Sequence, residues 1–154
     1  MLPAPDRLLG RETLMTTTLA SRPLGSVAET HGMRVSVTPQ YVADQSDPQA
    51  RQYLFTYRVG ILNNSEQAAR LMSRHWIIVD AQGVREEVRG PGVVGQQPRL
   101  EAGQSFEYSS FCPLKTSWGT MEGIYHFQRD DGSKFEVTVG RFYLVGPRIE
   151  PRRR

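Results

Sequence analysis

A run of alternating side chains between residues 52 and 62 constrains the fold more than any other feature of the chain. Every second position carries a large aromatic or aliphatic residue: Tyr53, Phe55, Tyr57, Val59 and Ile61. Alternate residues of an extended strand point to the same side, so these side chains form one continuous apolar face. The run therefore predicts a β-strand with one side in a hydrophobic core.

Shorter runs with the same period lie before and after this strand. Residues 33–42 alternate, and Pro39 favours placing them at the edge of a sheet. An Asn-Asn-Ser turn signal at residues 63–65 separates the central strand from a β-rich run that ends near Asp80, which predicts a hairpin. Two further strands are predicted around residues 106–108 and 124–128.

The last predicted hairpin turns at Asp131–Gly132, because type I′ turns favour Asp-Gly at their two central positions. The next strand has apolar residues on two opposite faces: Phe135, Val137 and Val139 on one, Phe142 and Leu144 on the other. A β-bulge at Gly140 would bring both groups to the same side. About seven short strands and no convincing amphipathic helix predict an all-β fold, an antiparallel β-sandwich.

Length and charge predict one domain with two tails. Residues 1–31 contain no aromatic residue and no sustained period, so we expect a flexible N-terminal extension, a folded domain at residues 32–147 and a basic tail at 148–154. The formal net charge of +3 comes from that tail, which holds four arginines and one glutamate. A neutral body lacks the broad basic surface that nucleic acids require, so we expect no nucleic-acid partner.

Cysteine use and hydropathy indicate where such a chain works. Cys112 is the sole cysteine, so no intrachain disulfide can form, and we expect a cytoplasmic protein. No stretch approaches the roughly 18 apolar residues of a membrane span, so we expect no membrane partner. His31, His75 and His126 lie far apart without metal-ligand spacing, and no nucleophile–base pair can be named. We therefore expect no metal, no cofactor and no enzymatic activity.

The first candidate site is the segment Gly90–Pro98, which contains a GxGxxG string at Gly90, Gly92 and Gly95. A dinucleotide fingerprint needs a buried apolar strand before the string and a helix after it. The preceding VREEVR is charged and Pro98 disfavours a helix, so that interpretation fails. Two interpretations stay open. The glycines either turn a loop between strands, or their N–H groups form a nest that weakly binds phosphate, pyrophosphate or a nucleotide.

Trp118, Met121 and Tyr125 form the second candidate site. They are interleaved with Gly119 and Gly123 in a stretch that we expect to be partly loop. Large aromatic residues at a loop-rich edge are typical of protein recognition, and they are equally typical of a lid over a core. The first interpretation predicts contacts with an unidentified protein partner. Open sandwich edges are also compatible with a homodimer.

Four stretches resemble the ApaG family when they are read together: SRHWIIVDAQG, GPGVVGQQPRLEAGQSFEYSS, PLKTSWGTMEGIYHF and DGSKFEV. The similarity extends from about Met33 to about Pro147. It implies a fibronectin type III-like or immunoglobulin-like sandwich, a link to cobalt resistance and magnesium efflux, and a binding module that is not an enzyme. The family's proposed nucleotide or pyrophosphate role would fall on Gly90, Gly92 and Gly95. This sequence departs at Pro91, where many relatives carry an acidic residue, and proline removes one N–H group from any nest.

Overall fold

Nine strands and two short 3-10 helices make up residues 24–147, which are the residues that the computed structural model describes. The strands are β1 (Ser26–Thr30), β2 (Met33–Tyr41), β3 (Tyr53–Asn63), β4 (Ala69–Asp80), β5 (Arg85–Pro91), β6 (Arg99–Leu100), β7 (Ser105–Leu114), β8 (Trp118–Arg129) and β9 (Lys134–Val145). The helices η1 (Ala43–Gln45) and η2 (Pro48–Ala50) lie between β2 and β3.

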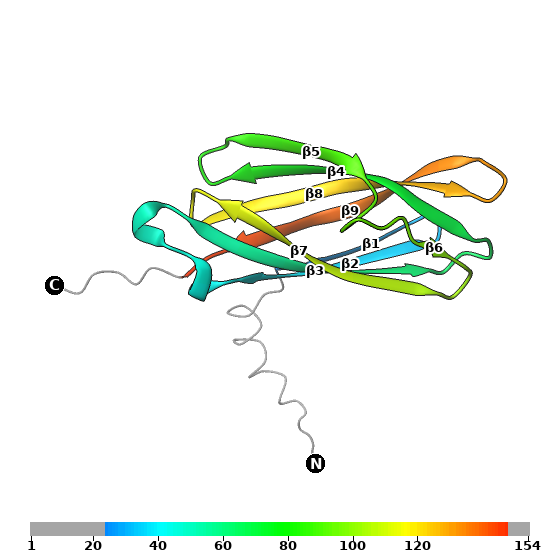
Figure 1. Cartoon of the computed structure of the whole chain (residues 1–154), viewed down its shortest axis with the longest axis horizontal. Coiled ribbons are helices and arrows are strands. Elements are labelled where there is room, and N and C mark those ends of the chain that lie inside the picture. The colour runs from blue at the N-terminus through cyan, green and yellow to red at the C-terminus, as the bar shows by residue number, and fades with distance from the viewer. Residues whose placement is uncertain (1–23, 148–154) are drawn as a thin grey trace, which may run out of the picture.

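The strands form two antiparallel sheets that pack face to face (Figure 1). One sheet has the order β1-β2-β3-β7, and the other has the order β5-β4-β8-β9 with β6 paired to β4. The predicted all-β antiparallel sandwich is confirmed. The expected N-terminal boundary is wrong, because β1 lies within residues 1–31 and pairs with β2 along its whole length. Residues 1–23 and 148–154 lie outside the described residues.

The core lies between the sheets and is rich in aromatic rings. The alternation of β3 is confirmed: Phe55, Tyr57, Val59 and Ile61 are buried, and Tyr53 packs against the core. Trp76 of β4 makes edge-on contacts with rings from three other strands, Tyr57, Tyr125 and Phe142. Such aromatic pairs contribute about 0.5–1.5 kcal/mol each beyond the area that they bury.

Two bulges set which side chains point into this core. In β9 the residues Gly140 and Arg141 together stand opposite Glu122 of β8, so the pairing shifts between Val139 and Phe142. The predicted bulge at Gly140 is thereby confirmed, and both apolar groups of β9 face the core, with Phe135 partly buried and the others fully buried. A second bulge in β4, at Met72, was not predicted.

The predicted hairpin between the central strand and the run up to Asp80 is wrong. β3 and β4 belong to different sheets, so the connection at residues 64–68 is an arch from one layer to the other. Asn63 explains the arch. Its backbone N–H donates to the Gln104 carbonyl, and its fully buried side chain binds both ends of the connection, which draws the chain out of the first sheet.

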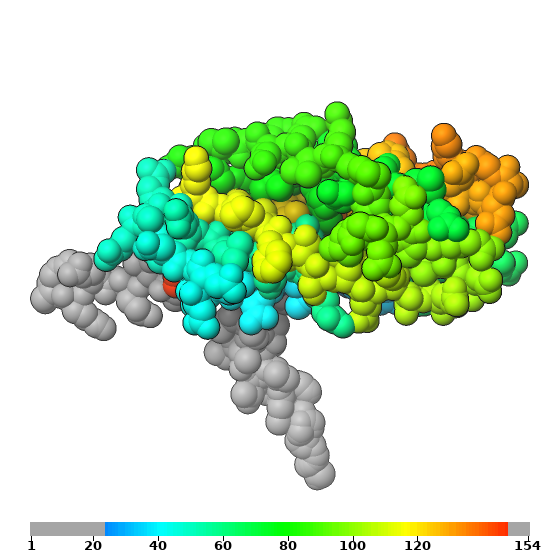
Figure 2. All heavy atoms as spheres, viewed as in Figure 1, coloured from blue at the N-terminus to red at the C-terminus, as the bar shows by residue number. Residues whose placement is uncertain are grey.

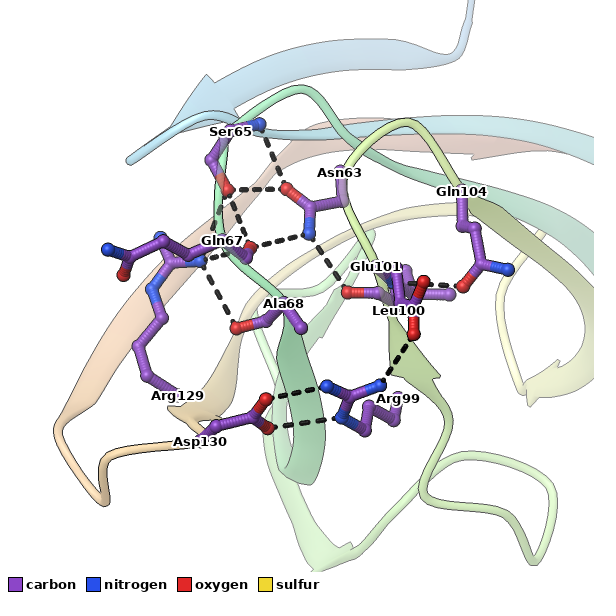
Figure 3. Close-up of polar contacts among 10 residues, drawn as sticks. All are labelled: Asn63, Ser65, Gln67, Ala68, Arg99, Leu100, Glu101, Gln104, Arg129 and Asp130. Carbon is purple, nitrogen blue, oxygen red and sulfur yellow. Dashed lines mark hydrogen bonds and ion pairs between the residues drawn. The ribbon is translucent and has the colours of Figure 1, made fainter.

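The Asn63 side chain uses its full hydrogen-bonding capacity at this arch (Figure 3). Nδ2 donates to the carbonyls of Gln67 and Leu100, each at 2.9 Å. Oδ1 accepts from the Ser65 N–H at 2.9 Å and the Ser65 hydroxyl at 2.5 Å. Arg129 donates to the same Gln67 carbonyl at 2.8 Å, which ties the β8–β9 hairpin to the arch.

One predicted turn and one predicted loop differ from the structure. Asp131–Gly132 does join β8 to β9, but only Gly132 has positive φ, and the loop spans four residues rather than a two-residue type I′ turn. The stretch from Trp118 to Tyr125, which we expected to be partly loop, lies within β8.

The two long edges of the sandwich differ. At one edge β9 lies against β1 and β2, held by a bond from the Ser26 hydroxyl to the Gly140 carbonyl at 2.7 Å and from the Tyr143 N–H to the Leu24 carbonyl at 2.9 Å. At the other edge are β5 and β7, each paired on one side alone. The segment after β5 descends across this edge toward β6 (Figure 1). Figure 2 shows the same edge facing the viewer.

Asn63→Ala should lower the free energy of unfolding by about 2–4 kcal/mol, because it removes four hydrogen bonds from a fully buried position and takes this partner from the Leu100 carbonyl and the Ser65 N–H. Asn64→Ala is the matched control, since Asn64 is exposed and its side chain makes one long bond of 3.4 Å to Glu29. Its effect should stay within about 0.5 kcal/mol. Urea denaturation of both variants measures the difference. Equal effects would show that the Asn63 network does not hold the arch.

Candidate functional site

The glycine string lies at the open edge of the sandwich and turns a strand. Gly90 is the penultimate residue of β5, and the chain reverses at Val94–Gly95, where both residues have positive φ, as in type I′ turns. Val93 and Gln96 flank this turn and exchange two hydrogen bonds of 2.8 Å. The string is followed by the two-residue strand β6, so the rejected dinucleotide interpretation has no helix to support it here.

The N–H groups of this loop are largely used within the protein. Gly92 N–H donates to the Met72 carbonyl at 2.8 Å, and those of Val93 and Gln96 are held by the turn. Pro91 has none. Gly92 also has φ +59°, and a Cβ there would lie 2.2 Å from the Gln96 carbonyl oxygen. These bonds favour the interpretation of the string as a strand-to-strand turn over the nest of converging amides.

Gly90 has no side chain and so leaves room for the guanidinium of Arg74. It pairs with Arg74 across the β4–β5 ladder, and a Cβ at Gly90 would lie only 3.0–3.2 Å from the guanidinium atoms Nη1, Cζ and Nη2. The Arg74 Nη1 donates to the carbonyls of Pro91 and Gly92, each at 3.0 Å. The guanidinium thus lies flat against β5 and holds the start of the glycine loop.

The bulge at Met72 turns Arg74 toward the core. Before the bulge, Leu71 pairs with the buried Phe127; after it, Arg74 pairs with the buried Tyr125. If residues 71–74 alternated without a bulge, Arg74 would point away from the side that Leu71 faces, because alternate residues of a strand point to opposite sides. Bulges commonly redirect a side chain in this way next to binding sites.

Arg74 lines a hollow of about 280 Å³ between the two sheets, which we call the Arg74 hollow. Its lining comes from both inner faces and from the loop: Tyr57, Arg74, Trp76, Pro91, Val93, Val94, Gly95, Tyr108 and Ser110. The candidate glycines therefore contribute one residue, Gly95, to its wall. Sequence reasoning missed Arg74 because the bulge that turns it inward leaves no clear signal in the sequence.

The inner wall of the Arg74 hollow carries hydroxyl groups in an apolar setting. Tyr108 and Tyr125 share a hydrogen bond of 2.5 Å between their hydroxyls, and Tyr57 lies beside Ser110. Burial raises the pKa of all three tyrosines, so they are neutral hydrogen-bonding groups at physiological pH. The nearby charge of Arg74 opposes this rise in the pKa of each tyrosine but is a smaller effect than burial.

The second candidate set is divided by the structure. Met121 is 1% exposed and Tyr125 0%, so both belong to the core and neither can touch a partner directly. That part of the expected protein contact is wrong, because residues 119–127 alternate as a strand whose odd positions face inward. Trp118 is 47% exposed on the opposite face of the same strand. It stands beside Val145 in the β8–β9 ladder, with Tyr143 one step along, and both of these are also exposed.

A polar row crosses the outer face of the second sheet. Ser73, His126 and Glu136 are in register on β4, β8 and β9. His126 Nδ1 lies 3.2 Å from the Ser73 hydroxyl, and Nε2 lies 3.5 Å from Glu136. The imidazole and the carboxylate are both well exposed, so solvent weakens their interaction.

Residues 24–147 hold neither a metal-ligand cluster nor a membrane-spanning helix. Within that range no three His, Cys, Asp or Glu side chains come together in a way that could hold a metal ion. The same residues include no helix that is long and apolar enough to cross a membrane.

The ApaG domain family has a sequence model that matches residues 43–129, which include the arch, the glycine loop and the whole of β8. The chain belongs to the ApaG family. Protein ApaG from Anaeromyxobacter dehalogenans is 52% identical over 122 residues, covering 79% of this chain and 96% of that protein. Protein ApaG from Brucella anthropi is 53% identical over 120 residues, covering 78% and 92%.

Solved structures agree with this membership. The crystal structure of the ApaA protein from Bordetella pertussis has a TM-score of 0.73 and 50% sequence identity, and it covers 82% of this chain and 100% of its own. The relatives are named only as protein ApaG, and these names state no activity. The role of the domain therefore has to be inferred from its surface.

Gly92→Ala should destabilise the ApaG domain by about 1–3 kcal/mol, because an alanine there is strained at positive φ and meets the Gln96 carbonyl. Gly95→Ala is the control: its φ is also positive, but nothing lies within 4 Å of the added methyl, so a cost of about 1 kcal/mol is expected. Thermal unfolding measures both. A smaller loss for Gly92→Ala than for Gly95→Ala would contradict the turn geometry.

Cys112 should be unreactive in the folded protein. Burial raises the pKa of its thiol to about 12, and the side chain is almost fully enclosed. At pH 8 the folded state therefore offers almost no thiolate, which is the reactive form. Ellman's reagent should modify Cys112 promptly in denaturant and only very slowly without it. Prompt reaction of the folded protein would disprove the enclosed, protonated thiol.

The same raised pKa values predict loss of stability in alkali. Unfolded cysteine and tyrosine ionise near pH 8.5 and pH 10 respectively, whereas Cys112, Tyr57, Tyr108 and Tyr125 keep their protons in the folded state. Above these pH values the folded state binds more protons than the unfolded state, so the free energy of unfolding falls as pH rises. Urea midpoints should be level from pH 7 to about pH 8.5 and fall steadily above it. A midpoint that is unchanged at pH 10.5 would contradict this account.

Proposed function

We propose that this ApaG-family chain is a non-catalytic binding module that contacts a protein partner through an exposed patch, Trp118, Tyr143 and Val145, which we call the Trp118 surface. The observation that carries the proposal is the exposure of these neighbouring large side chains, which are 47%, 42% and 44% exposed. They lie together at one end of the outer face of β8 and β9. Tryptophan and tyrosine are the residues that most often dominate protein interfaces.

Hydrogen bonds fix the backbone at the Trp118 surface, and an ion pair lies beside it. The Thr116 hydroxyl donates to the Trp118 carbonyl at 2.7 Å and accepts from the Ala81 N–H at 3.1 Å. On the same face the Arg141 guanidinium pairs with both carboxylate oxygens of Glu122, at 3.1 and 3.4 Å. An apolar centre with a charged border is the usual anatomy of an interface. A fixed backbone also lowers the entropy that binding costs.

The proposal includes an indirect connection to cobalt resistance and magnesium efflux, which the family resemblance implies. The chain would affect cation tolerance through the protein that it binds in the cytoplasm, and not by holding the cations itself. Direct phosphate or nucleotide binding by the amides of Gly90, Gly92 and Gly95 is the less favoured candidate, because internal bonds occupy the loop N–H groups of Gly92, Val93 and Gln96.

Trp118→Ala tests the proposal against a matched control. Phe111→Ala removes another exposed aromatic side chain, 63% exposed, from the outer face of the other sheet. The immobilised chain should capture a specific partner from a lysate of its own organism. Trp118→Ala should weaken the affinity for that partner by at least about tenfold, which is about 1.4 kcal/mol. Phe111→Ala should retain it.

Folding and self-association are checked alongside. Thermal unfolding should show all three proteins equally stable, because both changes are on the surface. Sedimentation at the capture concentration distinguishes a second copy of the chain from another protein. Equal capture by Trp118→Ala and the unchanged chain would remove the Trp118 surface from the proposal.

A further inference from the structure

Arg74 is a positive charge on the inner face of the sandwich whose guanidinium is only partly used. Both Nη1 hydrogens are committed to the carbonyls of Pro91 and Gly92. Within residues 24–147, Nε and Nη2 have no hydrogen-bond partner. These two nitrogens form one side of the guanidinium fork, which is the side that binds a carboxylate through two parallel hydrogen bonds.

No carboxylate of the described residues neutralises Arg74. Five other arginines, Arg58, Arg85, Arg89, Arg99 and Arg141, form ion pairs. The acidic residue on the inner face of β5 is Glu86, which pairs in register with Ile78, whereas Arg74 pairs with Gly90 at the other end of that strand. Arg74 is partly exposed at the open edge of the sandwich, so its unpaired Nε and Nη2 are accessible to an anion from outside.

The Arg74 hollow offers such an anion a donor-rich floor and apolar walls. Tyr57 and Ser110 stand opposite each other on β3 and β7, and both line the hollow together with Tyr108, so three hydroxyl-bearing side chains contribute to its wall. Trp76 and Val93, both buried, line the hollow as well. The ligand therefore needs an oxygen-bearing anionic head and an apolar remainder.

We propose that the Arg74 hollow binds a monoanionic carboxylate that carries a short apolar group, with the carboxylate on the Nε–Nη2 side of Arg74. One guanidinium balances one negative charge, whereas pyrophosphate or a nucleotide would bring charges that nothing described in the hollow neutralises. The volume of about 280 Å³ also lies at or below the roughly 300–1,000 Å³ of sites for larger ligands.

The carboxylate has two sources with the same chemistry, a free small acid and the C-terminus of a peptide. The hollow opens beside the exposed Val94 at the β5–β7 edge, where either can enter. The inference does not depend on the Trp118 surface. Trp118→Ala should leave carboxylate binding unchanged, so failure of one proposal can be told from failure of the other.

Titration of the full chain with isovalerate, followed by ¹⁵N NMR, tests the site directly. Saturable shifts are expected at the amides of Gly90 and Gly95 and at the Arg74 Nε. The neutral analogue isovaleramide should give none, and phosphate and pyrophosphate should bind more weakly. Acetyl-Ala-Val is compared with its C-terminal amide: tighter binding of the free acid than of isovalerate assigns the ligand to a peptide terminus, and weaker binding assigns it to a small acid.

Variants separate the site from the fold. Arg74→Gln should weaken isovalerate binding by at least about tenfold, as expected for charge-assisted hydrogen bonds. Arg70→Gln is the matched control, because Arg70 lies on the same strand and donates to the Gln97 carbonyl of the same loop at 2.8 Å, outside the hollow. It should change affinity by less than about twofold. Arg74→Lys keeps the charge and should restore only part of the binding.

The inference fails if isovalerate at concentrations up to about 50 mM produces no saturable shift in the unchanged protein. A specific site would bind isovalerate with a dissociation constant below that concentration. The inference also fails if pyrophosphate binds the hollow more tightly than isovalerate, or if Arg70→Gln weakens binding as much as Arg74→Gln. The first two measurements use the unchanged chain, so a folding defect in a variant cannot obscure them.

Discussion

The contact of Trp76 with three rings from other strands is the interaction on which the rest of the structure depends. Tyr57 comes from one sheet, and Tyr125 and Phe142 come from the other, so the indole joins both layers. Gly123 makes the contact possible, because a Cβ there would lie 2.9 Å from the Trp76 ring. The bulges in β4 and β9 serve the same contact: each returns a run of side chains to the inner face.

The sequence was sufficient for the strands that alternate and for the bulge at Gly140. Period-2 patterns report which side of a strand is buried, and β3 and β9 follow them closely. Sequence patterns could not show which strands pair. The Asn-Asn-Ser turn signal was correct as a turn and wrong as a hairpin, because the buried amide of Asn63 directs the chain into the other sheet.

The sequence was enough to find the glycines of the candidate site, but not to show that Arg74 lies beside them. Gly92 and Gly95 lie in the loop after β5, whereas Gly90 is in the strand itself, and their best-supported roles are to turn the chain and to make room for Arg74. Arg74 itself looks like an ordinary surface arginine in the sequence, because its inward direction depends on one extra residue in β4. Tyr125 illustrates the opposite error: next to Gly123 it resembled a recognition residue, yet it lies deep in the core.

The two layers of the sandwich are joined more strongly at the β9–β1 edge than at the β5–β7 edge. Hydrogen bonds such as that from Ser26 to Gly140 join the two layers along the β9–β1 side, whereas among residues 24–147 no hydrogen bond joins β5 to β7 on the other. Small opening motions will therefore be greatest at the β5–β7 side, pivoting about the fastened one. Water and small solutes can exchange there while the ring cluster around Trp76 stays closed.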